Sequence, residues 1–419
     1  MAYEEITAML GGWPGFRLVD VSREPATASH PVPKIVLTLE AVSGHPKRCS
    51  RCGSVVKEIH DISPREVRDL PILDAETWLV VPRARVECPT CGPTVEEVEW
   101  LDRYQRMTRR MAEFIARLAC ILPLKHVADL MGIGWDTVKQ IDKRSLQKRL
   151  GDVDLDGVRV IAIDEFAIRR GHRYATIVVE PTTKRVLWVG NGRSGEDLRP
   201  FFHLLGKERC SQIEAVVTDM FPPYVREIRD NCPQARIVYD LFHVIARYGN
   251  EVINQVRVAE TNKIARAGSL HDSKTRALRR VIKGTRWLLL KNRQNLAGKN
   301  EEIRLTELLE ANHALFVVYV LKEDLKDLWN HRSITEAREA WNDWYSRAMT
   351  SHIPQLVDFA RRLSRRIEQI LNHCLYPLHT GIVEGINNKI KVLKRTAYGF
   401  RDDAYFFLKI RAAFPGIPG

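Results

Sequence analysis

The stretch that decides the fold reads VRVIAIDEFAIRRGHRYATIVV and spans residues 158–179. Two runs rich in β-branched residues flank a basic turn that contains a glycine, a pattern typical of a β-hairpin. The first run, residues 158–163, is apolar at nearly every position, which predicts a strand buried on both faces of a sheet. Asp164 follows directly. We therefore expect a carboxylate to emerge at the end of a buried strand.

The elements predicted around this hairpin come in an order that indicates a fold. After the first strand, we expect strands at 174–179 and 185–189, a helix at 195–205, a strand at 213–218, a helix at 222–231 and a strand at 235–239. Three strands in a meander followed by alternating helices and strands is the order of an RNase H-like α/β core. The active site of that fold lies at the end of the first strand and just beyond the fourth, where this sequence has Asp164 and Asp219.

A third acidic residue lies near the C-terminus. Residues 246–370 contain no convincing strand, so we interpret them as an all-helical insertion. A further helix is predicted at 382–395. One face of it, at steps of three and four residues, carries Glu384, Asn387, Asn388, Lys391 and Arg395. This helix can bring a carboxylate, amides and cations to one site.

Carboxylates that converge on the end of a sheet repel one another unless divalent metal ions neutralise them. Hard oxygen ligands select Mg²⁺ or Mn²⁺. A pair of such ions suits phosphoryl transfer, because one activates a water or a 3′-hydroxyl and the other stabilises the leaving oxygen. Taken singly, each acid is better explained as a cap or a surface residue. Together, Asp164, Asp219 and Glu384 predict a two-metal site, with Lys391 and Arg395 as contacts to DNA.

Asp240 is the alternative second ligand, because it also follows a predicted strand. We favour Asp219, since it ends the strand expected beside the first, which leaves Asp240 and His243 at the start of the next helix. Glu165 adjoins Asp164, but its side chain should point to the other face of the sheet if the strand continues.

Four cysteines in the N-terminal region have the spacing of a metal site. Cys49 and Cys52 are followed by Gly53, and Cys88 and Cys91 by Gly92, which gives C-x2-C-x35-C-x2-C. Two such knuckles are typical of a zinc ribbon, and four thiolates leave no open position on a tetrahedral Zn²⁺, so the ion should be structural. The alternative is four unrelated buried thiols.

A helix-turn-helix is predicted after the ribbon. Helical periodicity covers residues 111–122, 124–131 and 135–146, and the link Gly132-Ile-Gly134 suits the turn. The third helix would enter the major groove, and its exposed candidates for contacting DNA are Trp135, Asp136, Thr137, Lys139, Gln140 and Lys143. A plain three-helix packing unit is the alternative.

Charge and composition limit the class of protein. The 419 residues include 65 Lys and Arg against 52 Asp and Glu, and residues 101–150 hold eleven of the former against five of the latter. Clustered basic charge predicts a polyanionic partner such as DNA. The sequence has no apolar run of membrane-spanning length and no signal peptide, so we expect a cytoplasmic protein.

Several motifs together resemble a known family. They are the Asp164-Glu165 pair, Val217-Thr-Asp-Met220, Tyr239-Asp-Leu-Phe-His-Val244, Glu384-Gly-Ile-Asn-Asn-Lys-Ile-Lys391 and Ala397-Tyr-Gly-Phe-Arg401. The chain is similar along nearly its whole length to bacterial insertion-sequence transposases of the ISL-three group. The resemblance implies a DDE transposase whose metal ligands are Asp164, Asp219 and Glu384. It also implies that Asp240 and His243 lie near the active site and assist DNA handling.

These predictions add up to a multidomain layout. We expect a zinc-ribbon region at 1–100, a helix-turn-helix at 101–150, the RNase H-like core at 151–245 and 371–419, and the insertion at 246–370. The expected function is binding of the element's terminal inverted repeats, metal-dependent cleavage and strand transfer into target DNA, by at least a dimer because two ends must meet. The alternatives are a DNA-binding regulator with an inactive core and a structure-selective nuclease without strand transfer.

Overall fold

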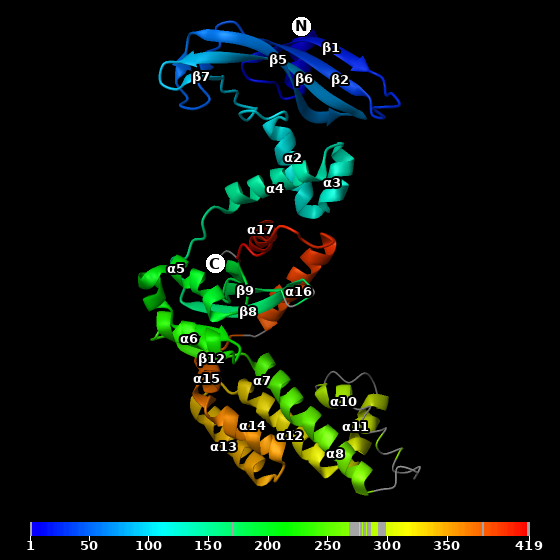
Figure 1. Cartoon of the computed structure of the whole chain (residues 1–419), viewed down its shortest axis with the longest axis vertical. Coiled ribbons are helices and arrows are strands. Elements are labelled where there is room, and N and C mark those ends of the chain that lie inside the picture. The colour runs from blue at the N-terminus through cyan, green and yellow to red at the C-terminus, as the bar shows by residue number, and fades with distance from the viewer. Residues whose placement is uncertain are drawn as a thin grey trace. The chain divides into compact units, whose positions relative to one another are not determined.

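A computed structural model gives the fold, in which residues 2–169, 171, 173–267, 276, 279, 282, 286–291, 299–378 and 381–416 are described. The remaining residues, which belong to the predicted hairpin turn, the predicted insertion and the C-terminal segment, lie outside the described part of the chain. The chain forms two compact units, Met1–Arg149 and Leu150–Gly419 (Figure 1). None of the helices in the described ranges has the length and apolarity needed to cross a membrane.

The first unit begins with a sheet. The order β1-β2-β6-β5, with β7 beside β6, is made by β1 (Phe16–Glu24), β2 (Lys34–Ala41), β5 (Ile59–Ile72), β6 (Ala75–Cys88) and β7 (Gly92–Val95). Helix α1 (Ala2–Met9) precedes the sheet, and β3 (Lys47–Arg48) pairs with β4 (Val55–Val56). Burial alternates along β6, so every second side chain, including Leu79 and Val81, enters the core.

The long β5-β6 hairpin was missed by the sequence interpretation, which recognised only a strand at 34–41. Ile72 pairs with Ala75, so the turn consists of Leu73 and Asp74. Leu73 adopts φ +55° and is almost fully exposed. Two-residue hairpin turns usually have the sequence Asn-Gly or Asp-Gly. Leu-Asp is not a typical turn sequence, so the hairpin could not be predicted from it.

Three helices follow the sheet and confirm the predicted helix-turn-helix: α2 (Arg109–Ile121), α3 (Leu124–Met131) and α4 (Trp135–Leu150). Thr108 caps α2 by accepting a hydrogen bond from the Met111 amide at 3.3 Å. Gly132 ends α3 with φ +62°, and a Cβ there would lie 2.7 Å from Glu76 Oε1. Only glycine satisfies both the left-handed turn and this close approach.

A buried carboxylate ties the helices to the sheet. Asp69 on β5 accepts hydrogen bonds from Trp13 Nε1 (3.1 Å), Thr108 Oγ1 (2.6 Å) and Arg110 Nε (2.8 Å), and a second Arg110 nitrogen pairs with it. Because Thr108 is also the cap of α2, one charge organises the start of that helix.

The second unit contains the sheet predicted from residues 158–239. Its strands are β8 (Val160–Arg169), β9 (Arg173–Glu180), β10 (Arg185–Asn191), β11 (Ala215–Thr218) and β12 (Arg236–Tyr239), in the order β10-β9-β8-β11-β12. The first three are antiparallel, and β11 runs parallel to both β8 and β12. This arrangement confirms the predicted RNase H-like fold class.

Helices cover both faces of this sheet (Figure 1). Alternate residues of β8, Ile161 and Ile163, belong to the core that includes α5 (Gly195–Gln212) and α6 (Pro222–Asn231). Phe166 and Ile168, whose side chains point to the opposite face of β8, pack on the C-terminal helices α16 (Gly381–Thr396) and α17 (Asp403–Ala413). Their partners there are Ile386, Ile390, Phe406 and Ile410. The C-terminal helices therefore complete the core that the earlier strands begin.

One expectation about β8 is wrong. Asp164 was expected at the end of the strand, whereas β8 continues to Arg169. The extension arises because β9 pairs with β8 as far as Arg169↔Arg173, while β11 pairs only up to Val217↔Ala162. Asp164 thus lies inside the strand, at the point where one of its two neighbours ends.

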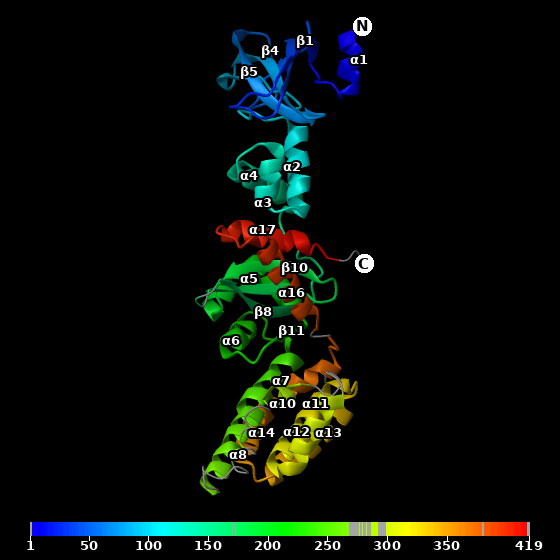
Figure 2. The ribbon, with the colours of Figure 1, turned by 90° about the vertical axis from the view of Figure 1, so that its right-hand side faces the viewer.

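The described part of the predicted insertion is helical throughout (Figure 2). Its elements are α7 (Leu241–Tyr248), η1 (Gly249–Ile253), α8 (Asn254–Ala267), α10 (Arg286–Leu290), α11 (Lys299–Ala311), α12 (His313–Asp327), η3 (Leu328–Asn330), α13 (Ile334–Thr350), α14 (Pro354–Ser364), α15 (Ile367–Leu371) and η4 (Asn372–Cys374). Trp344 is buried and donates to the Leu321 carbonyl at 2.7 Å. Buried Lys322 donates to the Lys291 carbonyl at 2.8 Å, which ties α12 to the end of α10.

The Asp69 network predicts a large local stability effect. Asp69→Asn should lower the free energy of opening of β5 and α2, measured by hydrogen exchange, by about 3–5 kcal/mol. The reason is that the substitution leaves the Arg110 guanidinium without its buried counter-charge. Asp102→Asn is the matched control: Asp102 pairs with Arg109 at 2.7 Å but at the surface, so its loss should cost about 0–1 kcal/mol. Equal effects of the two substitutions would contradict this account.

Candidate active site

Two acids stand side by side where β11 leaves β8. The last paired residues of these parallel strands are Ala162 and Val217. Asp164 and Asp219 each lie two residues beyond that pair, Asp164 within β8 and Asp219 directly after β11. The Asp219 carboxylate accepts a hydrogen bond from the Phe221 amide at 3.1 Å, and this contact forms the turn into α6.

Asp240 lies one strand further out. Tyr239 of β12 pairs with Thr218 of β11, and the Asp240 amide donates to the Thr218 carbonyl at 3.2 Å. Its Oδ1 caps α7 by accepting from the Phe242 amide at 2.7 Å, and its Oδ2 lies 3.3 Å from His243 Nδ1. Both carboxylate oxygens of Asp240 are therefore engaged within its own turn of helix.

Helix α16 reaches the first acid through an amide. Asn387 Nδ2 donates to Asp164 Oδ2 at 2.7 Å, a contact that joins residues 223 positions apart. Glu384 lies one turn earlier on α16 and is exposed. No hydrogen bond or ion pair between described residues joins Glu384 to Asp164 or Asp219. Asn388, Lys391 and Arg395 continue the exposed stripe, and Lys391 Nζ donates to Asn388 Oδ1 at 3.2 Å.

The charges of this site are unfavourable for carboxylates. Burial raises the pKa of Asp164 to about 6, and the charges of Asp240 and Asp219 add to the effect. Burial likewise raises the pKa of Asp219 and of Glu165. The Asp240 carboxylate is the main reason that the pKa of His243 is raised to about 9, and the charges of Asp164 and Asp219 reinforce it. The site is a half-buried acidic cluster in which His243 supplies part of the positive charge.

The donor set fits a hard divalent cation. Carboxylate and amide oxygens are the ligands that Mg²⁺ and Mn²⁺ prefer, and Asn387 Oδ1 is buried without a hydrogen-bond partner among the described residues. The cluster is more open than the cysteine site: in the described ranges, only the four cysteines form a group of three or more ligand atoms all within 4.8 Å of one another. A cation would favour the charged forms of Asp164 and Asp219, whose pKa values burial raises.

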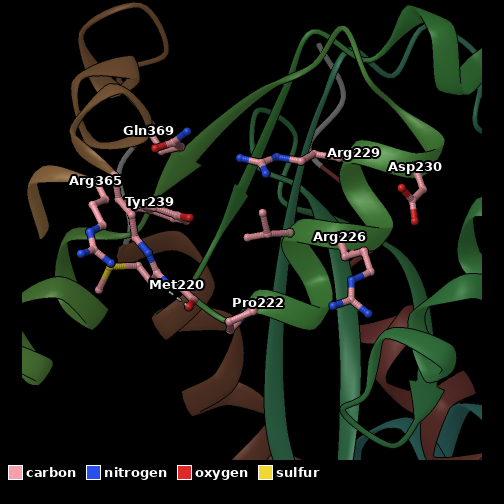
Figure 3. A pocket seen from close by; sticks show the side chains of 10 residues that line it. Met220, Pro222, Arg226, Arg229, Asp230, Tyr239, Arg365 and Gln369 are labelled. Carbon is pink, nitrogen blue, oxygen red and sulfur yellow. Dashed lines mark hydrogen bonds between the residues drawn. The ribbon is translucent and has the colours of Figure 1, made fainter. Parts of the chain in front are cut away.

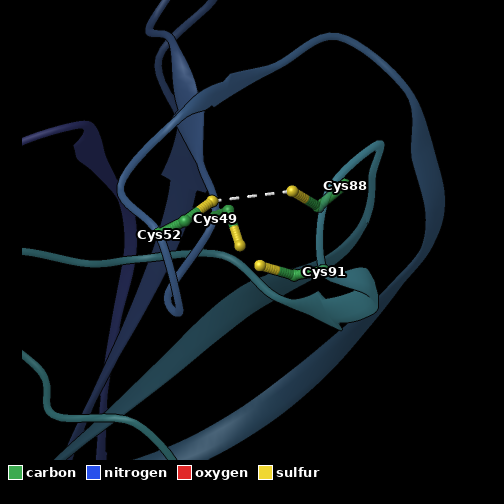
Figure 4. A group of neighbouring side chains, drawn as sticks. All are labelled: Cys49, Cys52, Cys88 and Cys91. Atoms are coloured by element: carbon green, nitrogen blue, oxygen red, sulfur yellow. Dashed lines mark hydrogen bonds between the residues drawn. The ribbon is translucent and has the colours of Figure 1, made fainter.

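The four cysteines converge in the first unit (Figure 4). Cys49 and Cys52 lie in the loop between β3 and β4, and Cys88 and Cys91 flank the β6-β7 turn. The sulfur atoms lie within 4.8 Å of one another, with Cys52 Sγ 3.7 Å from Cys88 Sγ. Tetrahedral Zn–S bonds of about 2.3 Å imply sulfur separations of about 3.8 Å. The cluster therefore has the composition and spacing of a structural zinc site.

The candidate DNA contacts lie on the first helical turns of α4. Trp135, Asp136, Thr137 and Gln140 are exposed, whereas Lys139 and Lys143 are only half-exposed, which corrects the expectation for these two. The Lys139 ammonium lies 5.9 Å from the centre of the Trp135 ring. Val138 and Leu146 are buried and hold the helix against its neighbours.

The sequence interpretation did not identify Lys394 as a residue that attaches α16 to the sheet. Lys394 Nζ donates to the carbonyls of Ala167 at 3.0 Å and Ile168 at 3.1 Å, and so fastens α16 to the part of β8 that extends beyond Asp164. The sequence gives no reason to distinguish Lys394 from Lys389 and Lys391. Only the packing of α16 on the sheet determines which of these lysines reaches the carbonyls of β8.

Comparison with known proteins places the chain in a family. A family model for ISL3 transposases matches residues 161–410, more than half of the chain. The chain belongs to the ISL3 family of transposases. Two further models match parts of the first unit: the helix-turn-helix domain of transposase family ISL3 at residues 96–146, and the zinc finger of the IS204/IS1001/IS1096/IS1165 transposases at residues 45–91. The predicted family and the predicted order of zinc ribbon, helix-turn-helix and catalytic domain are confirmed.

Curated relatives of this ISL3-family transposase are similar over most of their length. The transposase for insertion sequence element IS1001 of Bordetella parapertussis is 44% identical over 423 residues, which cover 99% of each chain. The transposase for insertion sequence element IS1557, from two strains of Mycobacterium tuberculosis, is 32% identical over 397 residues, or 89% of this chain and 88% of the relative. The chain is thus a transposase of an insertion-sequence family, with a helix-turn-helix of the type that binds DNA.

The cysteine cluster predicts a metal-dependent fold at one end of the first unit. Cys88→Ser should lower the zinc content of the purified protein from about one ion per chain toward zero and loosen the β6-β7 turn, because a structural site of this kind holds its loops together through the metal. Metal analysis by mass spectrometry measures the first effect and hydrogen exchange the second. Cys120→Ser, at an exposed cysteine outside the cluster, should change neither. Full zinc content in Cys88→Ser would refute the assignment.

Proposed function

We propose that this transposase binds the terminal inverted repeats of its own element through the zinc ribbon and helix-turn-helix, and cuts and rejoins DNA at Asp164, Asp219 and Glu384. The observation that carries the proposal is the position of Asp164 and Asp219, each two residues past the last pair of β8 and β11, with α16 hydrogen-bonded to Asp164. Glu384 lies one helical turn from that hydrogen bond. The same helix therefore offers the third carboxylate.

The residues that would hold two Mg²⁺ or Mn²⁺ ions are Asp164, Asp219 and Glu384. Such ions supply the activation of a water or 3′-hydroxyl and the stabilisation of the leaving oxygen. Asn387 fixes the orientation of the Asp164 carboxylate through its 2.7 Å hydrogen bond. Lys391 and Arg395, further along the exposed stripe of α16, hold the DNA backbone. Asn388 keeps the Lys391 ammonium in place.

The choice of Asp219 over Asp240 rests on geometry. Asp219 directly follows β11, the strand next to β8, whereas Asp240 directly follows β12, the strand beyond it. The Asp240 carboxylate already caps α7 and pairs with His243. Asp240 and His243 act together as an auxiliary pair, in which Asp240 holds the imidazolium close enough to offset the acidic cluster and to meet a DNA phosphate.

Binding of DNA ends follows from the exposed start of α4. Trp135, Asp136, Thr137 and Gln140 present side chains to the major groove, with Lys139 and Lys143 beside them at the backbone. Because each chain has one such helix and transposition joins two ends, we propose that the active form on DNA is a dimer or a larger oligomer. Target DNA is then joined at the same carboxylates.

Cleavage of a labelled element-end duplex tests the proposal. With Mg²⁺ or Mn²⁺, Asp219→Asn and Glu384→Asn should each lower the cleavage rate by about a thousandfold or more, since each removes a charged metal ligand worth several kcal/mol. Asp240→Asn should lower it by less than about tenfold, because asparagine also caps helices. Binding of the same duplex, measured in parallel, should be unchanged in all three variants.

Other outcomes favour other functions. If Asp219→Asn still cuts and Asp240→Asn does not, Asp240 is the second ligand. If the wild-type chain binds the ends but never cuts them, the protein acts as a DNA-binding regulator. Cutting of branched DNA without any joining to a target would make it a structure-selective nuclease.

A further inference from the structure

A groove rich in arginine begins next to the proposed active site. Two adjoining cavities, of about 390 and 240 Å³, share Met220, Arg365 and Arg366 in their walls (Figure 3). The first also has Arg226 and Arg229 of α6, and the second has arginines of α7 and α14. We call the six arginines the arginine groove: Arg226, Arg229, Arg247, Arg362, Arg365 and Arg366. Only two acids, Asp230 and Glu251, line the same walls.

Half of these arginines are held by the protein itself. Arg247 Nε and Arg362 Nη2 both pair with Glu251, at 3.0 and 2.7 Å. Arg366 Nη1 donates to the Met220 carbonyl at 3.1 Å. These contacts join α7, α14 and the residues after β11, so they give the groove a fixed frame.

The other half faces solvent. Arg226, Arg229 and Arg365 are exposed, and none makes a hydrogen bond or ion pair with another residue in the described part of the chain. Figure 3 shows them on the walls of the first cavity, Arg226 and Arg229 on α6 and Arg365 across from them. Three exposed guanidinium groups on the walls of one cavity, beside a single acid, Asp230, attract an anion from outside the chain.

The groove is lined by residues that neighbour the proposed ligands in the chain. Met220, shared by both cavities, directly follows Asp219, and Tyr239 in the wall of the first directly precedes Asp240. The charge of Arg247, in the wall of the second cavity, also acts on the Asp219 carboxyl group. The exposed cations of α16 belong to a different element, which packs on the face formed by β8, β9 and β10.

The chemistry of the walls selects a phosphate backbone. Arginine recognises phosphate through two parallel N–H donors, and contacts of this kind position DNA without reading its sequence. The apolar part of the first cavity consists of Met220, Pro222, Val225 and the Tyr239 ring, which is too little to enclose a small molecule. A chain of phosphates fits a row of arginines better than a single anion does.

We propose that the arginine groove binds the backbone phosphates of the DNA strand that leaves the reaction centre past Met220. This inference rests on the proposed function, because it assumes that DNA is bound at Asp164 and Asp219. The groove would add phosphate contacts that do not depend on the DNA sequence and are separate from the helix-turn-helix. These contacts would hold the strand next to the bond being cut. Arg226, Arg229 and Arg365 are the positioning residues, and Arg366 and Arg362 keep the walls in place.

The salt dependence of DNA binding tests the groove. The full chain would be titrated with a fluorescent duplex that carries the element's end and a helical turn of flanking DNA, at several KCl concentrations. In the triple variant Arg226→Ala/Arg229→Ala/Arg365→Ala, the slope of log K against log[salt] should become shallower by about 2 to 3, and binding at 0.1 M salt should weaken at least about tenfold. A shorter duplex that ends inside the sequence read by the helix-turn-helix should bind both proteins equally.

Two controls separate a groove from a general effect of charge or folding. The triple variant Lys207→Ala/Arg304→Ala/Arg332→Ala removes three exposed cations elsewhere in the second unit and should keep the wild-type slope. The Arg226→Lys/Arg229→Lys/Arg365→Lys variant keeps the charges, so it should keep the wild-type salt slope, although it loses some affinity with the paired N–H donors. A wild-type slope in the alanine variant, or equal losses in the lysine variant or in the control triple, would overturn the proposal.

Wild-type cleavage of the long duplex is measured with the same preparation. This measurement separates two outcomes. In one, the chain cuts DNA but the groove does not contribute to DNA binding; in the other, the chain does not cut DNA and the proposed function itself is wrong. If the alanine variant binds DNA normally but instead loses affinity for an acidic peptide or for a second copy of the chain, the DNA assignment of the groove is also wrong.

Discussion

The second unit depends on a parallel pairing that is short. Strand β11 runs beside β8 for only three residue pairs and stops at Val217, while β9 continues along the other side of β8 to Arg169. Asp164 and Asp219 both lie two residues past the last pair. Burial raises the pKa values of both carboxyl groups. A divalent cation bound between them would stabilise their charged forms.

The rest of the second unit can be understood as support for these two acids. The chain leaves the sheet at α7, after Asp240, and contacts it again where Asn372 donates to the Ile237 carbonyl of β12. Helix α16 then packs on the sheet with Asn387 on Asp164 and Lys394 on the carbonyls of β8. The arrangement brings acids from distant parts of the chain to one edge. It also sets the arginine groove beside Met220, which directly follows Asp219.

Much of this organisation is visible in the sequence because it rests on local patterns. The apolar run before Asp164, the strand before Asp219 and the two cysteine knuckles each reflect a short-range rule of burial or metal geometry. The spacing of Glu384 and Asn387 on one helical face was also readable, but the hydrogen bond to Asp164 was not, since it joins segments 223 residues apart.

Other features depend on tertiary packing or on weak turn signals. The long β5-β6 hairpin turns at Leu73 and Asp74, which carry no glycine, and the extension of β8 past Asp164 is decided by its partner β9. The arginine groove combines a spaced pair on α6, Arg226 and Arg229, with the doublet Arg365-Arg366 near the end of the insertion. Each pair alone reads as a solvated surface, and only the fold brings them together.

The central claim, that one metal site is shared by β8, the end of β11 and α16, can be tested without DNA. Fe²⁺ substituted for Mg²⁺, with ascorbate and peroxide, generates radicals that cut the backbone close to the bound ion, and mass spectrometry locates the cuts. The account predicts cuts near Asp164, Asp219 and Glu384 that excess Mg²⁺ suppresses. Cuts near Asp164 and Asp240 without any near Asp219, or no cut near Glu384, would contradict it.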